Sequence, residues 1–347
     1  MSERSDLLKS ISTTIADYRE GEMPRPTPEH VERWISQFAR DVQLPLLKEV
    51  DHVFGQLYFA KDLVIDIFNK RIKNENIAGK NPRTFWKRVN FLRIQKDGHS
   101  QEDLLALFDV CLRKQYGIDI NSCGAEDGAF IYLDDILFSG NRIGSDLSLW
   151  IQQAAPAKAI VHIFVFIVHS LGEWQMMEKL KDETIRAGKK IDFHLWRSMT
   201  LENRKSYRNS SEVLWPATIT ADANLIAYID QEKKFPFEFR KTGGSLKNNC
   251  FSSEEGRQLL EQEFLLAGMK IRALCKNPSN AMRPLGFSAF GLGFGSLIVT
   301  YRNCPNNCPL ALWWGDPESP RASPLSKWYP LVPRKTYGRA IDFDVVW

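Results

Sequence analysis

Two adjacent acids followed at short range by Ser-Gly are the residues of this sequence best placed to bind a ligand. The segment runs Phe130-Ile-Tyr-Leu, then Asp134-Asp135, then Ile-Leu-Phe, and reaches Ser139-Gly140. Carboxylates accept hydrogen bonds from ribose hydroxyls or from water on magnesium. A loop with serine and glycine that opens a helix directs backbone N–H groups at an anion. We expect a sugar and phosphate site; the alternative is a strand end whose acids cap the next helix or lie in solvent.

The surrounding pattern alternates short apolar strands with amphipathic helices. Helices are expected at 101–116, 143–153 and 172–187, and strands at 89–94, 130–133, 159–169 and 191–196. Strands joined by helices of this length form a doubly wound parallel α/β sheet with right-handed crossovers. Near-continuous apolar strands indicate burial on both faces. Ligands of such sheets bind beyond the carboxyl ends of the strands, where the two acids are expected to lie.

Residues 130–140 resemble the phosphoribosyl-pyrophosphate (PRPP) motif of the type I phosphoribosyltransferases. That motif is an apolar run, two acids, an apolar residue, two variable positions, Thr or Ser, and Gly, and the segment matches it throughout. The resemblance implies that Asp134 and Asp135 are the catalytic acids and hold the ribose 2′- and 3′-hydroxyls. It implies that the 5′-phosphate is bound by Phe138, Ser139, Gly140, Asn141 and Arg142. Arg142 departs from the family, many of whose members have Thr or Ser at this position. Its positive charge can neutralise the phosphate, but it has no hydroxyl to donate.

The same resemblance implies an earlier loop that binds pyrophosphate through backbone amides. The equivalent here lies between the strand at 89–94 and the helix at 101–116, and it contains Lys96, Gly98 and Ser100. Glycine and serine suit an anion nest, and lysine suits the pyrophosphate charge. Such a loop is also common without any ligand, so a purely structural role is the alternative. The family further implies Mg²⁺ as the cofactor, with no direct protein ligand.

A closer resemblance is to phosphoribosyltransferase-like proteins of prokaryotic conflict and antiphage systems, some of which accompany retrons. It is carried by the N-terminal segment 31–38, the central motif, and a C-terminal strand that runs into residues 303–309 and Trp313. The resemblance implies a cytoplasmic effector that transfers phosphoribose from PRPP to an unknown nitrogen acceptor, with a defence-system protein or ribonucleoprotein as partner. The alternative is a noncatalytic module that senses a nucleotide or serves as a scaffold for partner proteins.

The segment after the last predicted strand, 295–301, has two open interpretations. It reads Asn303-Cys-Pro305-Asn306-Asn307-Cys-Pro309. If the strand lies beside the sheet, the amides of Asn306 and Asn307 can read the edge of a base, because an amide both donates and accepts. Otherwise these residues form the turn that Pro305 starts.

Three regions are expected along the chain. Residues 1–80 have the apolar spacing of helices, 81–230 form the phosphoribosyltransferase-like α/β core, and 231–347 combine a helix at 254–275 with the last strand and an extended tail. The tail, 316–333, is rich in Pro and Ser and is expected to run over the surface. The N-terminal helices are either a cap that binds a partner or a layer that covers the sheet.

Composition narrows the functional classes further. The chain has 347 residues with 44% hydrophobic and 25% charged side chains, and its net charge of +4 gives no argument for a nucleic-acid or membrane surface. Six scattered cysteines and an N-terminus without an apolar signal core predict a reducing, cytoplasmic setting. The most apolar stretch, 159–168, is about half the length that crosses a bilayer. We therefore expect no membrane partner.

Other chemical motifs are missing or incomplete. Two acids after an apolar strand also describe a Walker B segment, but the chain contains no GxxxxGK[ST] loop. The glycines of residues 291–295 lead into a strand instead of a helix, which does not fit a dinucleotide fingerprint. Cys304 and Cys308 are too few for a structural zinc site. His162 and His169 alternate along an apolar strand and are expected to be core or sheet-end residues.

Overall fold

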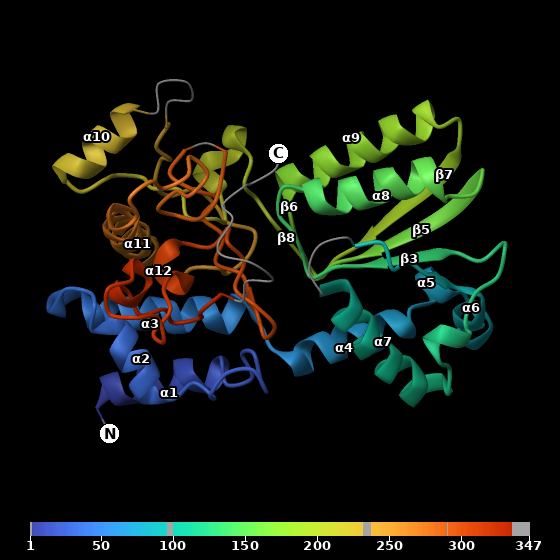
Figure 1. Cartoon of the computed structure of the whole chain (residues 1–347), viewed down its shortest axis with the longest axis horizontal. Helices are drawn as coiled ribbons and strands as arrows, with labels where there is room; N and C mark the ends of the chain where they lie inside the picture. The colour runs from blue at the N-terminus through green and yellow to red at the C-terminus, as the bar shows by residue number, and fades with distance from the viewer. Residues whose placement is uncertain (1, 96–99, 232–236, 290, 335–347) are drawn as a thin grey trace. The chain divides into compact units, whose positions relative to one another are not determined.

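The computed structural model describes residues 2–95, 100–231, 237–289 and 291–334, and the chain divides into two compact units (Figure 1). Unit 1 combines Met1–Lys61 with Asn203–Trp347, and unit 2 is Asp62–Glu202. The boundaries between the two units therefore lie after residues 61 and 202, whereas the sequence pattern suggested boundaries after 80 and 230. Within the described ranges, no helix is long and apolar enough to cross a membrane.

Unit 2 is built on a parallel sheet of four strands. These are β2 (Asn90–Phe91), β3 (Phe130–Leu133), β5 (Lys158–Phe164) and β7 (Lys190–Trp196), in the order β2-β3-β5-β7. The register places Phe130 beside Val161 and Val161 beside Phe193. This confirms the α/β class with a parallel sheet flanked by helices.

Three of these strands continue after breaks of two residues. The continuations are β4 (Ile136–Leu137), β6 (Ile167–His169) and β8 (Met199–Leu201), which form a second parallel sheet in the order β4-β6-β8. The single strand predicted at 159–169 is therefore two strands. Hydrogen bonding continues through the break, because Asp134 N–H donates to the Phe164 carbonyl at 3.0 Å and Phe166 N–H to that of Asp135 at 2.9 Å.

Helices cover both faces of the unit 2 sheet (Figure 1). One face carries α8 (Asn141–Gln153) and α9 (Ser170–Arg186); the other carries α4 (Lys61–Ile72), α5 (Glu75–Ala78), α6 (Pro82–Arg88) and α7 (Ser100–Tyr116). Alternate residues of β5 serve the two faces, as strand geometry requires. Val161 and Ile163 join the core under α8 and α9, whereas the Phe164 ring lies 6.2 Å from that of Phe108 in α7.

Unit 1 brings the two ends of the sequence together. Its helices are α1 (Glu3–Thr14), α2 (Pro28–Ile35), α3 (Arg40–Leu57), α10 (Ala223–Gln231), α11 (Glu254–Leu274) and α12 (Leu310–Trp313). α3 continues through Pro45 and packs on α11. Trp34 is fully buried, and its indole N–H donates to the Ala311 carbonyl at 2.9 Å. The N-terminal helices thus share a core with the C-terminal third.

The predicted last strand is shorter than expected and belongs to unit 1. Of residues 295–301, only Val299–Thr300 form a strand, β9, which pairs in parallel with β1 (Tyr58–Phe59). The pattern of apolar residues indicated a strand correctly, but it gave no partner. Pairing with β1 joins segments some 240 residues apart, which local sequence does not encode.

The tail prediction was wrong in part. Trp328, Leu331 and Val332 are buried, and Val332 N–H donates to the Leu312 carbonyl at 2.9 Å. Tyr329 Oη lies 2.7 Å from Nδ1 of His30. The prolines of the tail exclude long helices and strands, but its apolar side chains are still buried and complete the unit 1 core.

Candidate functional site

The two acids lie in the break between β3 and β4, where strand geometry changes. The side chain of Asp134 is 3% exposed, whereas Asp135 is half-buried. Each carboxylate accepts a backbone N–H from the next residue: Asp135 N–H donates to Asp134 Oδ1 at 2.9 Å and Ile136 N–H to Asp135 Oδ1 at 2.8 Å. Both acids are thereby held in a fixed orientation at the carboxyl end of β3.

The local electrostatics of the pair are unusual for aspartates. Burial, followed by the neighbouring charge of Asp135, raises the pKa of Asp134 to about 7, and Arg142 partly opposes this shift. Asp134 therefore changes charge near neutral pH. The pKa of Arg142 is raised overall. Desolvation alone would lower it, but the negative charges of Asp134 and Asp135 have the larger combined effect. The arrangement places one cation beside two carboxylates that repel each other.

Gly140 is required by packing as well as by backbone conformation. Its φ is +76°, in the left-handed region that favours glycine. A Cβ added at Gly140 would lie 2.4 Å from the Gly172 carbonyl oxygen, and one at Gly172 would lie inside contact distance of the Phe138 carbonyl. The loop therefore packs backbone to backbone against the start of α9. From the sequence, this glycine was expected only to let an anion approach, because its contact with Gly172 in α9 leaves no local signal.

The loop leads into a helix terminus with features that favour an anion. Gly140 is the N-cap of α8 and has no side chain to cap it, and no acid lies in the first turn. Ser139, Asn141 and Arg142 are exposed, and Ser139 Oγ accepts Asn141 N–H at 3.4 Å. Backbone N–H groups and one hydroxyl thus lie where the sequence predicted the phosphate loop, and the Arg142 guanidinium is close enough to Asp134 and Asp135 to feel their charge.

Two contacts that the sequence did not indicate support this loop. Tyr132 Oη, on β3, donates to Asp146 Oδ2 at 2.8 Å and ties α8 to the sheet. The His169 ring stacks on that of Phe138 at 5.1 Å, and its Nδ1 lies 3.1 Å from the Leu137 carbonyl. Burial lowers the pKa of His169 to about 4, so it is neutral. Its interpretation as a buried sheet-end histidine is confirmed.

The predicted pyrophosphate loop lies largely outside the described residues. This applies to Lys96 and Gly98. Ser100 is buried at the start of α7, where its hydroxyl donates to Gln95 Oε1 at 2.9 Å. Gln101 was not singled out from the sequence, yet its Oε1 accepts Ile94 N–H at 2.8 Å and its Nε2 reaches the Leu133 carbonyl at 3.4 Å. Gln101 therefore joins the segment that follows β2 to the end of β3, directly before the acids.

A buried arginine that was not predicted from the sequence lies on the other face of the sheet. Arg71, in α4, donates through Nη2 to the carbonyls of Val165 at 2.5 Å and Trp196 at 3.1 Å. Burial lowers its pKa to about 9. It holds β5 and β7 together where both strands break. An arginine within a helical pattern gives no sequence signal for such a role.

Asn306 and Asn307 lie in a turn of unit 1. Cys308 N–H donates to the Pro305 carbonyl at 3.1 Å, which closes the turn, and Asn307 Nδ2 donates to the Phe287 carbonyl at 3.1 Å. These contacts match the interpretation in which Pro305 starts a turn.

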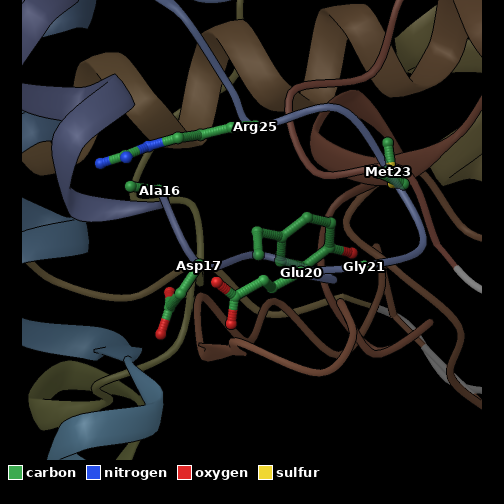
Figure 2. A pocket seen from close by; sticks show the side chains of 7 residues that line it. Ala16, Asp17, Glu20, Gly21, Met23 and Arg25 are labelled. Atoms are coloured by element: carbon green, nitrogen blue, oxygen red, sulfur yellow. The ribbon is translucent and has the colours of Figure 1, made fainter.

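A separate hollow of about 380 Å³ lies in unit 1. It is lined by a bend after α1, and Figure 2 shows the carboxylates of Asp17 and Glu20 on one side and Arg25 across from them. Asp17 already accepts the Tyr58 hydroxyl at 2.6 Å and Lys61 N–H at 2.7 Å. Asp17 therefore serves the local fold, and the residues predicted from the sequence do not line this hollow.

The carboxylates of Asp134 and Asp135 suit magnesium only when a phosphorylated ligand shares the ion. Across the described ranges, no three His, Cys, Asp or Glu side chains gather as a metal cage. Mg²⁺ commonly keeps several waters and is held by one or two carboxylates together with substrate phosphates. The half-buried carboxylate of Asp135 suits this mode of binding, in which the ion is shared with a phosphorylated ligand.

Comparison with known proteins gives one match. The family model PRTase-CE matches residues 31–334, which include most of α2, all of α3 to α12 and the whole of unit 2. No curated protein and no solved structure matches the chain. The match covers both the strand break with the two acids and the helix terminus that follows it.

Proposed function

Because the chain belongs to the PRTase-CE family, and is thus phosphoribosyltransferase-like, we propose that it binds PRPP with Mg²⁺ and transfers phosphoribose to a nitrogen acceptor. The observation that carries this proposal is the juxtaposition in unit 2 of two oriented carboxylates with the N-terminus of α8, whose N-cap residue Gly140 has no capping side chain. Asp134 and Asp135 precede Gly140 by only a few residues, and the loop between them is held against α9. Sugar and phosphate are recognised by these two kinds of group.

In the proposed complex, each residue has a distinct task. Asp135 accepts the ribose hydroxyls through its half-buried carboxylate, and Asp134 does so when ionised. Ser139, Asn141 and Arg142 bind the 5′-phosphate together with the backbone at Gly140. The loop that contains Lys96, Gly98 and Ser100 binds pyrophosphate. Magnesium, when bound, neutralises charge on the leaving pyrophosphate.

The reaction requires positioning more than covalent chemistry. The bond between ribose C1 and the pyrophosphate oxygen breaks as a nitrogen lone pair of the acceptor forms the new C1–N bond. Charge develops on C1 as in an oxocarbenium ion, so the protein contributes by holding the ribose and by excluding water. The two fixed carboxylates serve this purpose because their orientation is set by backbone N–H groups before any ligand binds.

A noncatalytic module is the second candidate, and the burial of Asp134 favours it. This carboxyl is nearly inaccessible and accepts its own neighbour's N–H, so it can be a structural residue that fixes the break in β3. In that case the pocket senses a nucleotide or is a scaffold for a partner protein. A pyrophosphate-release assay separates the two functions: steady release with an acceptor supports the transferase, and tight binding without turnover supports the sensor.

Isothermal titration calorimetry tests the proposed site directly. Wild type is expected to bind PRPP in the presence of Mg²⁺, and Asp134→Asn/Asp135→Asn is expected to bind at least about tenfold more weakly, since a hydrogen bond to a charged group contributes roughly 1.5–3 kcal/mol. Asp182→Asn, an exposed acid in α9, is the matched control and should bind like wild type. Equal affinity in all three proteins would remove the basis for the roles of Asp134 and Asp135.

The resemblance to conflict-system proteins extends the proposal to antiphage defence, with a partner protein or ribonucleoprotein in the cytoplasm. Phage plating efficiency on a bacterial host that carries the chain and its native neighbouring genes tests this role. Protection should be lost with Asp134→Asn/Asp135→Asn and kept with Asp182→Asn. Equal plating with and without wild type would refute the defence role, while calorimetry would still decide whether PRPP binds.

A further inference from the structure

The unit 2 sheet ends on a long strand whose outer side is open. β7 is the last strand in the order β2-β3-β5-β7, and its seven residues pair with β5. Within the described ranges, no strand pairs with its other side. The opposite end of the sheet, β2, is only two residues long. An edge strand presents N–H and C=O groups that can pair with another chain.

The hydrogen bonds to β5 determine which groups face outward. Lys190 N–H donates to the Ala157 carbonyl at 2.8 Å, and the Trp196 carbonyl accepts Val165 N–H at 3.0 Å. Backbone groups alternate in direction along a strand. The N–H and C=O groups that point away from β5 are therefore those of Ile191, Phe193 and Leu195.

Side chains of β7 divide between the two faces in the same alternation. Ile191, Phe193 and Leu195 pack into the core under α8 and α9. Asp192 and His194 are exposed on the other face, where the His194 ring stacks on that of His162 at 5.2 Å. One face of the strand is thus apolar, and the other has three exposed polar side chains, because Lys190 is exposed there as well.

We propose that β7 pairs in antiparallel orientation with β7 of a second copy of this chain, about a two-fold axis at Phe193. All seven residues of the strand then overlap. Phe193 faces its own counterpart and Ile191 faces Leu195, so the outward N–H and C=O groups are exchanged in hydrogen-bonded pairs. On the exposed face, each Asp192 lies opposite His194 of the other copy. The interface is isologous, as two-fold dimers require.

The pairing of Asp192 with His194 selects this register over its neighbours, because an imidazole N–H donates to a carboxylate whether or not the ring is charged. A two-fold axis at residue 192 would place two Asp192 carboxylates directly opposite each other, and an axis at residue 194 would place two histidines there. Like charges directly opposite each other destabilise a strand pair, whereas opposite charges stabilise it. Both shifted registers also shorten the overlap. The strand is therefore complementary to itself only when Phe193 lies on the axis.

Analytical ultracentrifugation of the full chain tests the proposal. Wild type is expected to be a dimer. His194→Glu places a carboxylate opposite Asp192 twice, and Asp192→Lys removes the carboxylate that accepts from His194 twice, so each is expected to be a monomer or to dimerise at least tenfold more weakly. The double variant Asp192→Lys/His194→Glu restores opposite charges across the axis and should dimerise again. Asp182→Lys makes the same charge change on exposed α9 and should leave the dimer intact.

Circular dichroism identifies any variant that fails to fold, and the double variant then decides. A monomeric wild type, a folded single variant that dimerises like wild type, or a folded double variant that remains monomeric would each overturn the proposal. These outcomes do not depend on PRPP, so the dimer and the proposed function can fail separately.

Discussion

Replacing Gly140 with alanine tests whether the candidate phosphate loop is fixed by its contact with α9. Gly140 has a φ of +76°, and a Cβ there would lie 2.4 Å from the Gly172 carbonyl oxygen and 2.8 Å from Met176 Cβ. Gly188 is the matched control: its φ is +63°, but a Cβ would meet nothing within 4 Å. The two substitutions share the backbone strain and differ in the clash.

The expected magnitudes follow from these two terms. A side chain in the left-handed region costs about 1–2 kcal/mol, and forcing extra atoms into a packed site costs about 1–3 kcal/mol more. Gly188→Ala should therefore lower the free energy of unfolding by about 1–2 kcal/mol. Gly140→Ala should lower it by about 2–5 kcal/mol.

Amide hydrogen exchange in α8 and α9 is the suitable assay, because it reports opening of unit 2 even where the two units unfold separately. Gly140→Ala should open these helices at markedly lower free energy than Gly188→Ala. It should also weaken the binding of ribose 5-phosphate. Equal losses in the two variants would refute the close approach of the loop to α9.

Three further changes test contacts around the site. The pKa of Asp134 is raised to about 7, so the folded state binds the proton more tightly than the unfolded chain does. In urea unfolding, the stability of wild type relative to Asp134→Asn should therefore fall as pH rises from 5 to 8. A stability difference that stays constant over this range would contradict the raised pKa. Tyr132→Phe should lower stability by about 0.5–1.5 kcal/mol, and a double-mutant cycle with Asp146→Asn should show that the two losses do not add. Arg71→Met should lower the free energy of unfolding in urea by about 3 kcal/mol, because two buried carbonyls lose a charged donor. An unchanged urea midpoint would show that Arg71 does not hold β5 and β7 together at their breaks.

Local pattern was sufficient for the central elements of the fold. The strand at Phe130–Leu133 and the helix at Glu254–Leu274 lie where apolar spacing placed them. Both have strong signals: a run of buried residues before two acids, and a long helical period that begins after a serine N-cap. Side-chain periodicity reports burial directly, so elements with one clear buried face are predictable.

Pairing and support of the site were not predictable in this way. The break at Asp134 and Asp135 depends on matching breaks in β5 and β7, and neither of those strands has a distinguishing residue type at that point. Gln101 joins the segment after β2 to the end of β3 through contacts made only after folding. The requirement for Gly140 arises from Gly172, 32 positions later, which no local pattern connects to it. Tertiary contacts, and not propensity, determine these features.

A crystal structure of the chain with bound ribose 5-phosphate tests the central claim most directly. The phosphate is expected within hydrogen-bond distance of the backbone N–H groups at residues 140–142 and of Ser139 Oγ, with the ribose hydroxyls on Asp135 and Asp134. A ligand bound in unit 1, or a phosphate that contacts none of the groups at the start of α8, would contradict the proposed site.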